Sequence, residues 1–229
     1  MTTRRVYNEQ LHDLREKTIA LGRMVEEHLK LSLEALEKSD VKLAKQLRKA
    51  DKKVNAARFA IEEQCTTLIA LQQPVLAGDL RVVLAMMYVI VDLERIGDKT
   101  KSIAKAVIRL GKNADVEVAA EIQKMGDKVV SLLAQSLKAF EQDNVDLAKQ
   151  VVAQDDKVDR MFSKIVGQLS EPDHHDEFAI DYQILTIVRA LERCGDLSAN
   201  VAERVIYIVT GKVSDVDVDL DDVLEEYLS

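Results

Sequence analysis

The sequence predicts an all-α protein of six long helices, which form two tandem three-helix bundles related by pseudo-symmetry. Three observations lead to this fold class. Apolar residues recur every three or four positions over long stretches, which is typical of amphipathic helices. Only two prolines and eight glycines occur in 229 residues, so few points force a helix to end. Two long segments of the chain also match each other, which indicates that one helical unit was duplicated.

The duplication is visible when the chain is aligned with itself. Residues 21–55 match residues 125–159 at a constant offset of 125 − 21 = 104. The string E-R-x-G-D occurs at 94–98 and again at 192–196, at an offset of 192 − 94 = 98. The second copy is therefore six residues shorter before its last helix. This period is much longer than the roughly 20 to 50 residues of a solenoid repeat, so we interpret it as a duplicated subdomain.

Apolar spacing and helix-breaking residues delimit the helices. In the first copy, apolar residues with helical spacing run from 11 to 36 and from 54 to 68; in the second, from 122 to 140 and from 151 to 169. The third helix of each copy carries E-R-x-G-D. Helices of this length with short connections are typical of antiparallel bundles. Breaks are expected at the following positions: 38–40, 72–79, 111, 141–144, 170–177 and 211.

These breaks divide the chain into a first three-helix unit at 1–112, a second at 113–212 and an acidic C-terminal tail at 213–229. We expect the tail to be mobile or to form a short terminal helix. Its aspartates partly match a calcium-binding loop, but the sixth position is Leu220, where the loop turn needs glycine. A calcium site in the tail is therefore not expected.

Composition and charge exclude several classes of protein. The net charge of −8 argues against a nucleic-acid-binding surface, which would be basic. The N-terminus lacks the apolar region of a signal peptide, and the apolar run Val82–Val91 is far shorter than the roughly 20 residues of a membrane span. We expect a cytoplasmic protein that reaches the membrane only through protein partners. Cys65 and Cys194 lie far apart outside any CxxC pattern, and we expect reduced, packed thiols.

Acidic residues four positions apart recur in both copies, and on a helix such residues share a face. Side by side, two neighbouring helices of each copy would gather oxygen-bearing side chains: Asp51, Asn55, Glu94 and Asp98 in the first copy, and Asp155, Asp159, Glu192 and Asp196 in the second. Oxygen ligands without His or Cys favour Mg, Ca, Mn or Fe over structural zinc. The spacing alone leaves a second interpretation open, in which these are solvated faces paired with Arg95 and Arg193.

Glycine precedes the aspartate of each motif, at Gly97 and Gly195, inside otherwise strong helices. Glycine costs about 1 kcal/mol relative to alanine in a helix interior. We expect these glycines to allow a close approach between helices.

Four motifs resemble the PhoU family, the accessory regulators of bacterial high-affinity phosphate uptake. They are DLERIGDKTKSIA at 92–104, ALERCGDLSANVAE at 190–203, GDLR at 78–81 and VIYIVTGK at 205–212, and the similarity extends from about Leu11 to Lys212. The resemblance implies two tandem three-helix bundles whose acidic motifs hold divalent or trivalent metal ions, Fe, Mn, Mg or Zn. Carried over position by position, the ligands are Asp51, Glu94, Asp98, Asp155, Asp159, Glu192 and Asp196.

The resemblance also implies a function. Such a protein is a non-enzymatic negative regulator of the phosphate-starvation response and a modulator of high-affinity phosphate uptake. It links the ATPase subunit of a phosphate ABC transporter to a sensor histidine kinase, and it forms a homodimer.

The two copies depart from the family pattern to different degrees. The family motif often continues as GD-x-x-x-N-I-A-E, and the second copy keeps Asn200 and Glu203. The first copy has Ser102 and Lys105 there, and Asn55 in place of an acid. We therefore expect the second site to bind metal more tightly.

Two other functions stay open. A metal-buffering or storage protein would need only the acidic clusters. An oxygen-activating di-metal enzyme would need a Glu-x-x-His pair from each of two helices in the bundle core. Residues 9–12 and 171–174 match that string, but the first is near the terminus and the second contains proline. We expect His174 and His175 to lie in a solvated connection.

Overall fold

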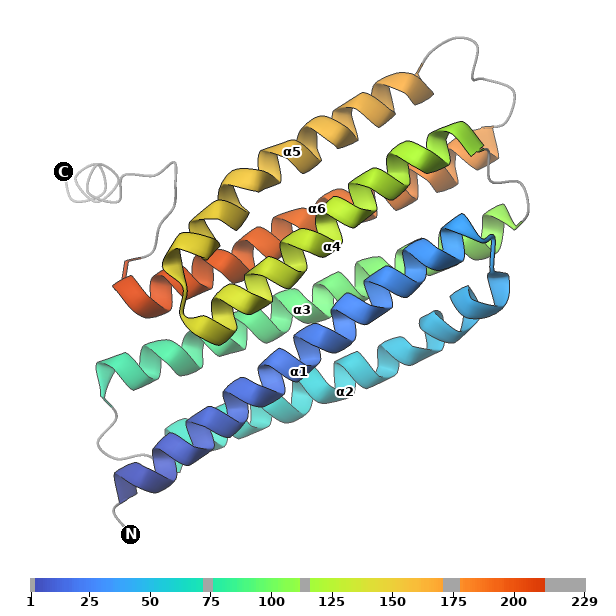
Figure 1. Ribbon diagram of the computed structural model, residues 1–229. Helices are drawn as coiled ribbons and strands as arrows, with labels where there is room; N and C mark the ends of the chain where they lie inside the picture. Colours follow the sequence, from blue (N-terminus) through green and yellow to red (C-terminus); the bar gives the residue numbers. More distant parts are fainter. Residues whose placement is uncertain (1–2, 72–75, 112–115, 171–177, 213–229) are drawn as a thin grey trace, which may run out of the picture.

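Six α-helices make up almost all of the computed structural model, which describes residues 3–71, 76–111, 116–170 and 178–212 (Figure 1). They are α1 (Thr3–Glu37), α2 (Val41–Leu71), α3 (Ala77–Leu110), α4 (Val116–Gln142), α5 (Val145–Leu169) and α6 (Phe178–Thr210). The predicted fold class is confirmed. Two boundaries differ: α4 ends at Gln142, inside the break expected at 141–144, and α3 begins inside the break expected at 72–79. Asp79 lies in its first turn, where an acidic side chain favours a helix start, and it pairs with Arg4 of α1.

The same turn joins the first two helices of each half. Ser39 and Asp143, which are 104 positions apart, both have φ of 50° in the left-handed region. The next residue then caps the following helix: Asp40 Oδ1 accepts from two backbone N–H groups at the start of α2, both at 2.9 Å, and Asn144 Oδ1 accepts from one at the start of α5, at 3.0 Å. The duplicated sequence therefore builds a duplicated turn.

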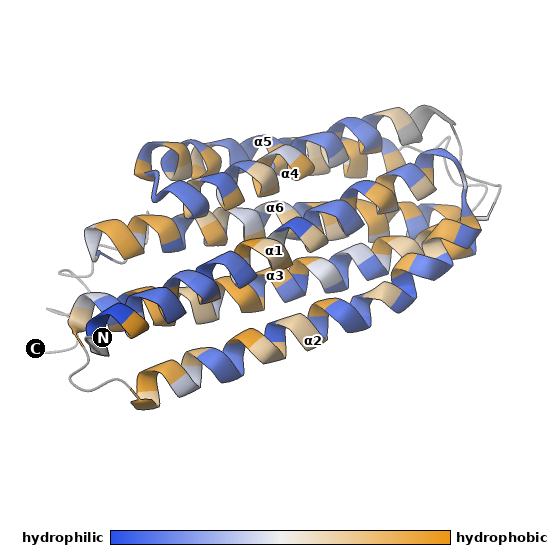
Figure 2. Ribbon diagram, turned by 60° about the horizontal axis from the view of Figure 1, so that its bottom comes forward, coloured by the Kyte–Doolittle hydropathy of each residue, from blue (hydrophilic) through white to orange (hydrophobic). Residues whose placement is uncertain are grey.

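The helices run roughly along one direction (Figures 1 and 2). α3 and α6 form the most extensive contact in the described structure, although they belong to different halves. α1 packs on α3, α4 packs on α6, and α1 and α4 also contact each other. α2 packs against α1 and α3, and α5 packs against α4 and α6. The third helices of the two halves are therefore at the centre, and each acidic motif lies on a helix that α2 or α5 contacts.

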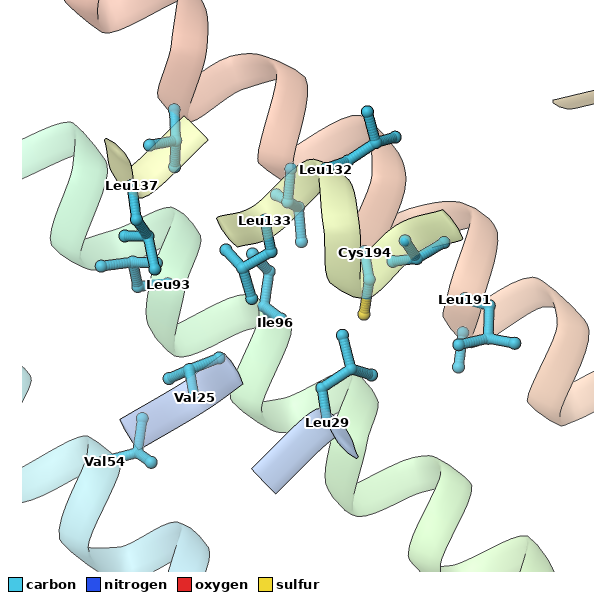
Figure 3. Close-up of a cluster of buried hydrophobic side chains, with 14 of the residues drawn as sticks. Val25, Leu29, Val54, Leu93, Ile96, Leu132, Leu133, Leu137, Leu191 and Cys194 are labelled. Atoms are coloured by element: carbon cyan, nitrogen blue, oxygen red, sulfur yellow. The ribbon is translucent and has the colours of Figure 1, made fainter. Parts of the chain in front are cut away.

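Buried residues of both halves form one hydrophobic core. Hydrophobic and hydrophilic residues alternate along every helix in Figure 2, in agreement with the amphipathic pattern of the sequence. The close-up in Figure 3 places Val25 and Leu29 of α1 close to Ile96 of α3, with residues of α4 and α6 around them. The division at 112/113 stays a prediction of the sequence, and the core runs across it.

Two glycines join α1 to α4 by equivalent contacts. A Cβ added to Gly22 would overlap the side chain of Leu137, and one added to Gly126 would lie 2.5 Å from Cδ2 of Leu33. Gly22 and Gly126 are equivalent in the duplication, as are Leu33 and Leu137 (137 − 33 = 104). Each half therefore inserts a leucine against the glycine of the other.

The cysteines and the apolar helices also bear on the sequence predictions. Cys65 and Cys194 are free and fully buried, and burial raises the pKa of their thiols to about 11 and about 12, which confirms the expectation of packed thiols. None of the described helices is long and apolar enough to cross a membrane. The acidic tail at 213–229 lies outside the described residues, as do His174 and His175.

Candidate metal centre

The acidic residues of the second half converge where α5 contacts α6. Asp159, Glu192 and Asp196 each place a carboxylate oxygen within 4.8 Å of the oxygens of the other two. We call these three residues and Asp155 the second acidic cluster. Two oxygens bound to one ion at about 2.1–2.4 Å can lie roughly 3–5 Å apart. The three carboxylates thus have the separation that a single hard cation requires.

Asp155 is the more buried acid of α5 in this cluster. Its Oδ1 is buried without a hydrogen-bond partner among the described residues. Burial, followed by the negative charges of Asp196, Asp159, Asp156 and Glu192, raises the pKa of its carboxyl group to about 7. A cation bound by Asp159, Glu192 and Asp196 would reduce the repulsion between these carboxylates and Asp155.

Gly195 provides the space for the Asp155 carboxylate against α6. A Cβ at position 195 would lie 2.8 Å from Asp155 Oδ1 and 3.2 Å from Val158 Cγ1. At the equivalent Gly97, a Cβ would lie 3.1 Å from Val54 Cγ1 and has no carboxylate among its nearest neighbours. The expected close approach of helices is confirmed at both glycines. At Gly195 alone, that approach also admits a candidate ligand.

The alternative interpretation, a salt-bridged face, applies to part of the second cluster. Arg193 Nη1 lies 2.8 Å from Asp196 Oδ2, and Arg193 Nε lies 3.5 Å from Glu192 Oε2. The Arg193 side chain is 51% exposed, and ion pairs at the surface stabilise by about 0–1 kcal/mol. No ion pair within 4.0 Å reaches Asp155 or Asp159 in the described part of the chain. Arg193 therefore compensates the outer carboxylates and leaves the inner one uncompensated.

The first acidic cluster, formed by Asp51, Glu94 and Asp98, has a different environment. Asp51 is 5% exposed, and its Oδ2 accepts a hydrogen bond from Lys101 Nζ at 2.6 Å. Lys101 Nζ also lies 3.6 Å from Asp98 Oδ1. Arg95, predicted as a partner of the motif acids, pairs with Asp92 instead, at 3.4 Å. The first cluster thus already contains a cation that belongs to the chain.

The two clusters differ in their fit to the metal that the sequence resemblance implies. Both clusters contain a buried carboxylate oxygen without a hydrogen-bond partner among the described residues, Asp51 Oδ1 and Asp155 Oδ1. The second also offers three converging carboxylates and a space that a Cβ would fill; its residues would hold a hard cation such as Mn²⁺, Mg²⁺ or Fe²⁺. The first does not fit while Lys101 lies between Asp51 and Asp98. Lys101 is not part of the E-R-x-G-D motif. The signal was present, because the equivalent residue in the second copy is Ala199 (101 + 98).

A di-metal enzyme would need its Glu-x-x-His pairs in the bundle core, and the first such pair, at residues 9–12, does not lie there. Glu9 and His12 are exposed near the start of α1, outside the bundle core. Residues 171–174 lie outside the described structure.

Substitution of Gly195 is expected to weaken metal binding through the position of Asp155. In Gly195→Ala, the new Cβ displaces the Asp155 carboxylate, and displacement of a supporting group typically lowers metal affinity by about 10-fold or more. Gly97→Ala is the matched control, since it introduces the same methyl group against Val54. Titration with Mn²⁺, followed by the EPR signal of the free ion, measures both. Equal affinities in the two variants would contradict the placement of Asp155 in the site.

Comparison with known proteins relates this arrangement to one family. The PhoU domain model matches residues 18–107 and 122–205, which include both clusters. The chain is 36% identical over 217 residues to the phosphate-specific transport system accessory protein PhoU homolog of Clostridium acetobutylicum, covering 94% of this chain and 99% of the relative. It is 32% identical over 209 residues to the phosphate-specific transport system accessory protein PhoU of Escherichia coli K12, and the match covers 90% of this chain and 86% of the relative.

Solved structures agree with the sequence comparisons. The crystal structure of the phosphate transport system regulatory protein PhoU from Streptococcus pneumoniae superposes with a TM-score of 0.84 at 32% identity, covering 91% of this chain and 99% of that one. The crystal structure of PhoU from Pseudomonas aeruginosa gives a TM-score of 0.85 at 33% identity, and the match covers 90% of this chain and 100% of that one. The duplicated bundle, the repeated acidic motif and these similarities over nearly the whole chain show that the protein belongs to the PhoU family.

Proposed function

We propose that the chain is a non-enzymatic negative regulator of the phosphate-starvation response and a modulator of high-affinity phosphate uptake. In this role it links the ATPase subunit of a phosphate ABC transporter to a sensor histidine kinase. The observation that carries the proposal is membership of the PhoU family over nearly the whole length of relatives named as accessory proteins of phosphate-specific transport. We further propose a cytoplasmic location, with attachment to the membrane through these partners. The homodimer stays a prediction.

The second acidic cluster gives the proposed regulator a surface that responds to cations. A divalent ion bound there would supply the positive charge that the inner carboxylate lacks. Asp159 would hold it from α5, and Glu192 and Asp196 would hold it from α6. The sequence resemblance adds Asp155 of α5 to these ligands. Because these ligands come from two helices, binding would tie α5 to α6 and remove negative charge from the adjacent surface. Charge complementarity governs partner choice and association rate, so this surface would change its affinity for a basic partner patch.

Deletion of the gene is expected to raise alkaline phosphatase activity, a reporter of the phosphate-starvation response, in cells grown in high phosphate. Restoring the wild-type chain is expected to lower the activity several-fold. Asp159→Asn/Asp196→Asn is expected to restore repression only in part, since it removes two cluster carboxylates. Asp127→Asn/Asp146→Asn is the control, because it removes the same charge at exposed positions outside both clusters and should repress fully.

The outcomes separate the proposed function from the metal-buffering alternative. An unchanged reporter after deletion would overturn the regulatory role. Measured metal binding together with an unchanged reporter would favour a metal buffer, since the acidic cluster would then act without signalling. Full repression by Asp159→Asn/Asp196→Asn would show that the regulatory role does not depend on metal binding at the second acidic cluster.

A further inference from the structure

We propose that the ammonium group of Lys101 is the resident cation of the first acidic cluster, so that metal binding by this chain is confined to the second. The inference rests on the metal site proposed above for the second half. It goes further by assigning a role to Lys101 and by excluding metal from the first half, although both halves carry the same acidic motif.

The contacts of Lys101 are those expected of a built-in counter-ion. Asp51 is 5% exposed, and a buried carboxylate needs a cation or several hydrogen-bond donors. Lys101 Nζ lies 2.6 Å from Asp51 Oδ2 and 3.6 Å from Asp98 Oδ1, and thus bridges α2 to α3. A lysine amine is protonated at neutral pH, so this contact places a positive charge on the buried carboxylate. A metal ion could bind both carboxylates only after this ammonium left.

One further basic group adds positive charge to the first cluster. Arg58 of α2 lowers the pKa of Glu94, whereas burial lowers the pKa of His28 of α1, so that imidazole is neutral at neutral pH and adds no charge. The pKa of Glu94 is nevertheless raised, chiefly by burial and next by the negative charge of Asp98. The first cluster is therefore acidic in sequence, but Lys101 and Arg58 supply positive charge to it.

The second half has apolar residues at every one of these positions. The equivalent residues, at offsets of 98 for α3 and 104 for α1 and α2, are Ala199 for Lys101, Phe162 for Arg58 and Leu132 for His28. Ala199 is 7% exposed and Leu132 is fully buried, so neither position contributes charge. Arg193 is the nearest candidate for the same role, but its contacts are with Glu192 and Asp196 on the exposed side. Asp155 Oδ1 is left without a partner in the described structure.

A consequence is that the two halves respond differently to the metal content of the solution. The first cluster is compensated permanently, and its link between α2 and α3 is independent of metal. In the second cluster Arg193 compensates only Glu192 and Asp196, and the remaining negative charge is compensated only when a cation binds. The chain therefore has one cation-responsive half and one constant half, in place of two equivalent sites.

The test is the number of Mn²⁺ ions bound per chain, measured by equilibrium dialysis with metal analysis on the full-length protein. Four proteins are compared: wild type, Lys101→Ala, Asp159→Asn/Asp196→Asn, and the combination of these three substitutions. The expected numbers are one, two, none and one. Lys101→Arg keeps the charge and should bind one ion, like wild type. Asn55→Asp/Lys101→Ala, which copies the ligand set of the second cluster, should bind the additional ion more tightly than Lys101→Ala.

Each result has a distinct meaning. Two ions in the wild type, of which one is lost in Asp51→Asn, would overturn the role of Lys101. A Lys101→Ala protein that is folded by circular dichroism and binds one ion would also overturn it, and Lys101→Met repeats the test with the aliphatic stem retained. A wild type that binds no ion would overturn the metal site of the proposed function. In that case Lys101→Ala still decides the inference, which holds only if this variant gains an ion.

Discussion

Replacing Asp159 and Asp196 by asparagine is expected to lower the Mn²⁺ affinity of the second cluster by about 100-fold or more, because loss even of supporting groups costs about 10- to 100-fold. The two residues contribute two of the three carboxylates whose oxygens lie within 4.8 Å of one another. Isothermal titration of the wild type and the double variant measures the change. The control is Asp127→Asn/Asp146→Asn, which should retain the wild-type affinity. An affinity within a few-fold of wild type in the cluster variant would contradict the site.

The same double variant is expected to change how the stability of the metal-free protein depends on pH. The raised pKa of Asp155, about 7, means that the folded protein retains a proton that the unfolded chain has lost above pH about 4. This group therefore stabilises the fold below pH about 4 relative to higher pH, and that stability is lost as the pH rises to about 7. Removing the charges of Asp159 and Asp196 lowers the pKa of Asp155 and restores stability at pH 8.

Urea unfolding with a chelator present, at pH 5 and pH 8, measures this linkage. The wild type should lose more stability than the double variant between the two pH values, by on the order of 1 kcal/mol after allowance for solvent screening. Saturating Mn²⁺ should stabilise the wild type at pH 8 and leave the variant nearly unchanged. An equal loss of stability in both proteins would show that Asp155 is not coupled to these carboxylates.

Replacement of Gly126 by valine is expected to destabilise the protein by about 2–3 kcal/mol, because extra atoms in a packed interior cost about 1–3 kcal/mol or more. Even a Cβ would lie 2.5 Å from Leu33 Cδ2, and the valine methyl groups need more space. Gly22→Val should have a similar effect through Leu137, since the contact is repeated by the duplication. The free energy of unfolding in urea measures both variants.

Two controls make this prediction specific to the contact between α1 and α4. Gly167 lies in α5 with no atom within 4 Å of an added Cβ, so Gly167→Ala should be neutral or stabilising by up to about 1 kcal/mol. The double variant Gly126→Val/Leu33→Ala should cost less than the sum of its single substitutions, because the smaller side chain at position 33 makes room. Additive costs would show that Leu33 does not oppose Gly126.

Local features of the chain accounted for most of the fold. The period of apolar residues depends on one helix at a time, and so it predicted the helices without knowledge of their neighbours. Asp40 and Asn144 cap the helices that follow them through contacts within three residues of the chain. The helical start of α3 lies earlier than the sequence pattern predicts. The ion pair that holds Asp79 of its first turn, with Arg4, joins residues 75 positions apart, which a local pattern does not register.

The candidate site shows the same division. The spacing of Glu192 and Asp196 on one helix indicated a shared face, and the duplication indicated where the partner acids of α5 lie. Whether a carboxylate has its negative charge neutralised by a basic side chain depends on residues from different helices. Lys101 and Asp51 are 50 positions apart, and their ion pair exists only because α2 and α3 pack in one particular register.

The sequence by itself determined the helices, their turns, the duplication and the family, since each follows from short-range pattern or from similarity along the chain. The tertiary structure alone decided that Lys101 compensates Asp51, that Asp155 Oδ1 has no hydrogen-bond partner among the described residues, and that Gly22 and Gly126 receive leucines from the opposite half. The physical reason is that helix periodicity specifies which face is buried but not which residues of two helices meet. That choice is made by the close packing of side chains across helix contacts.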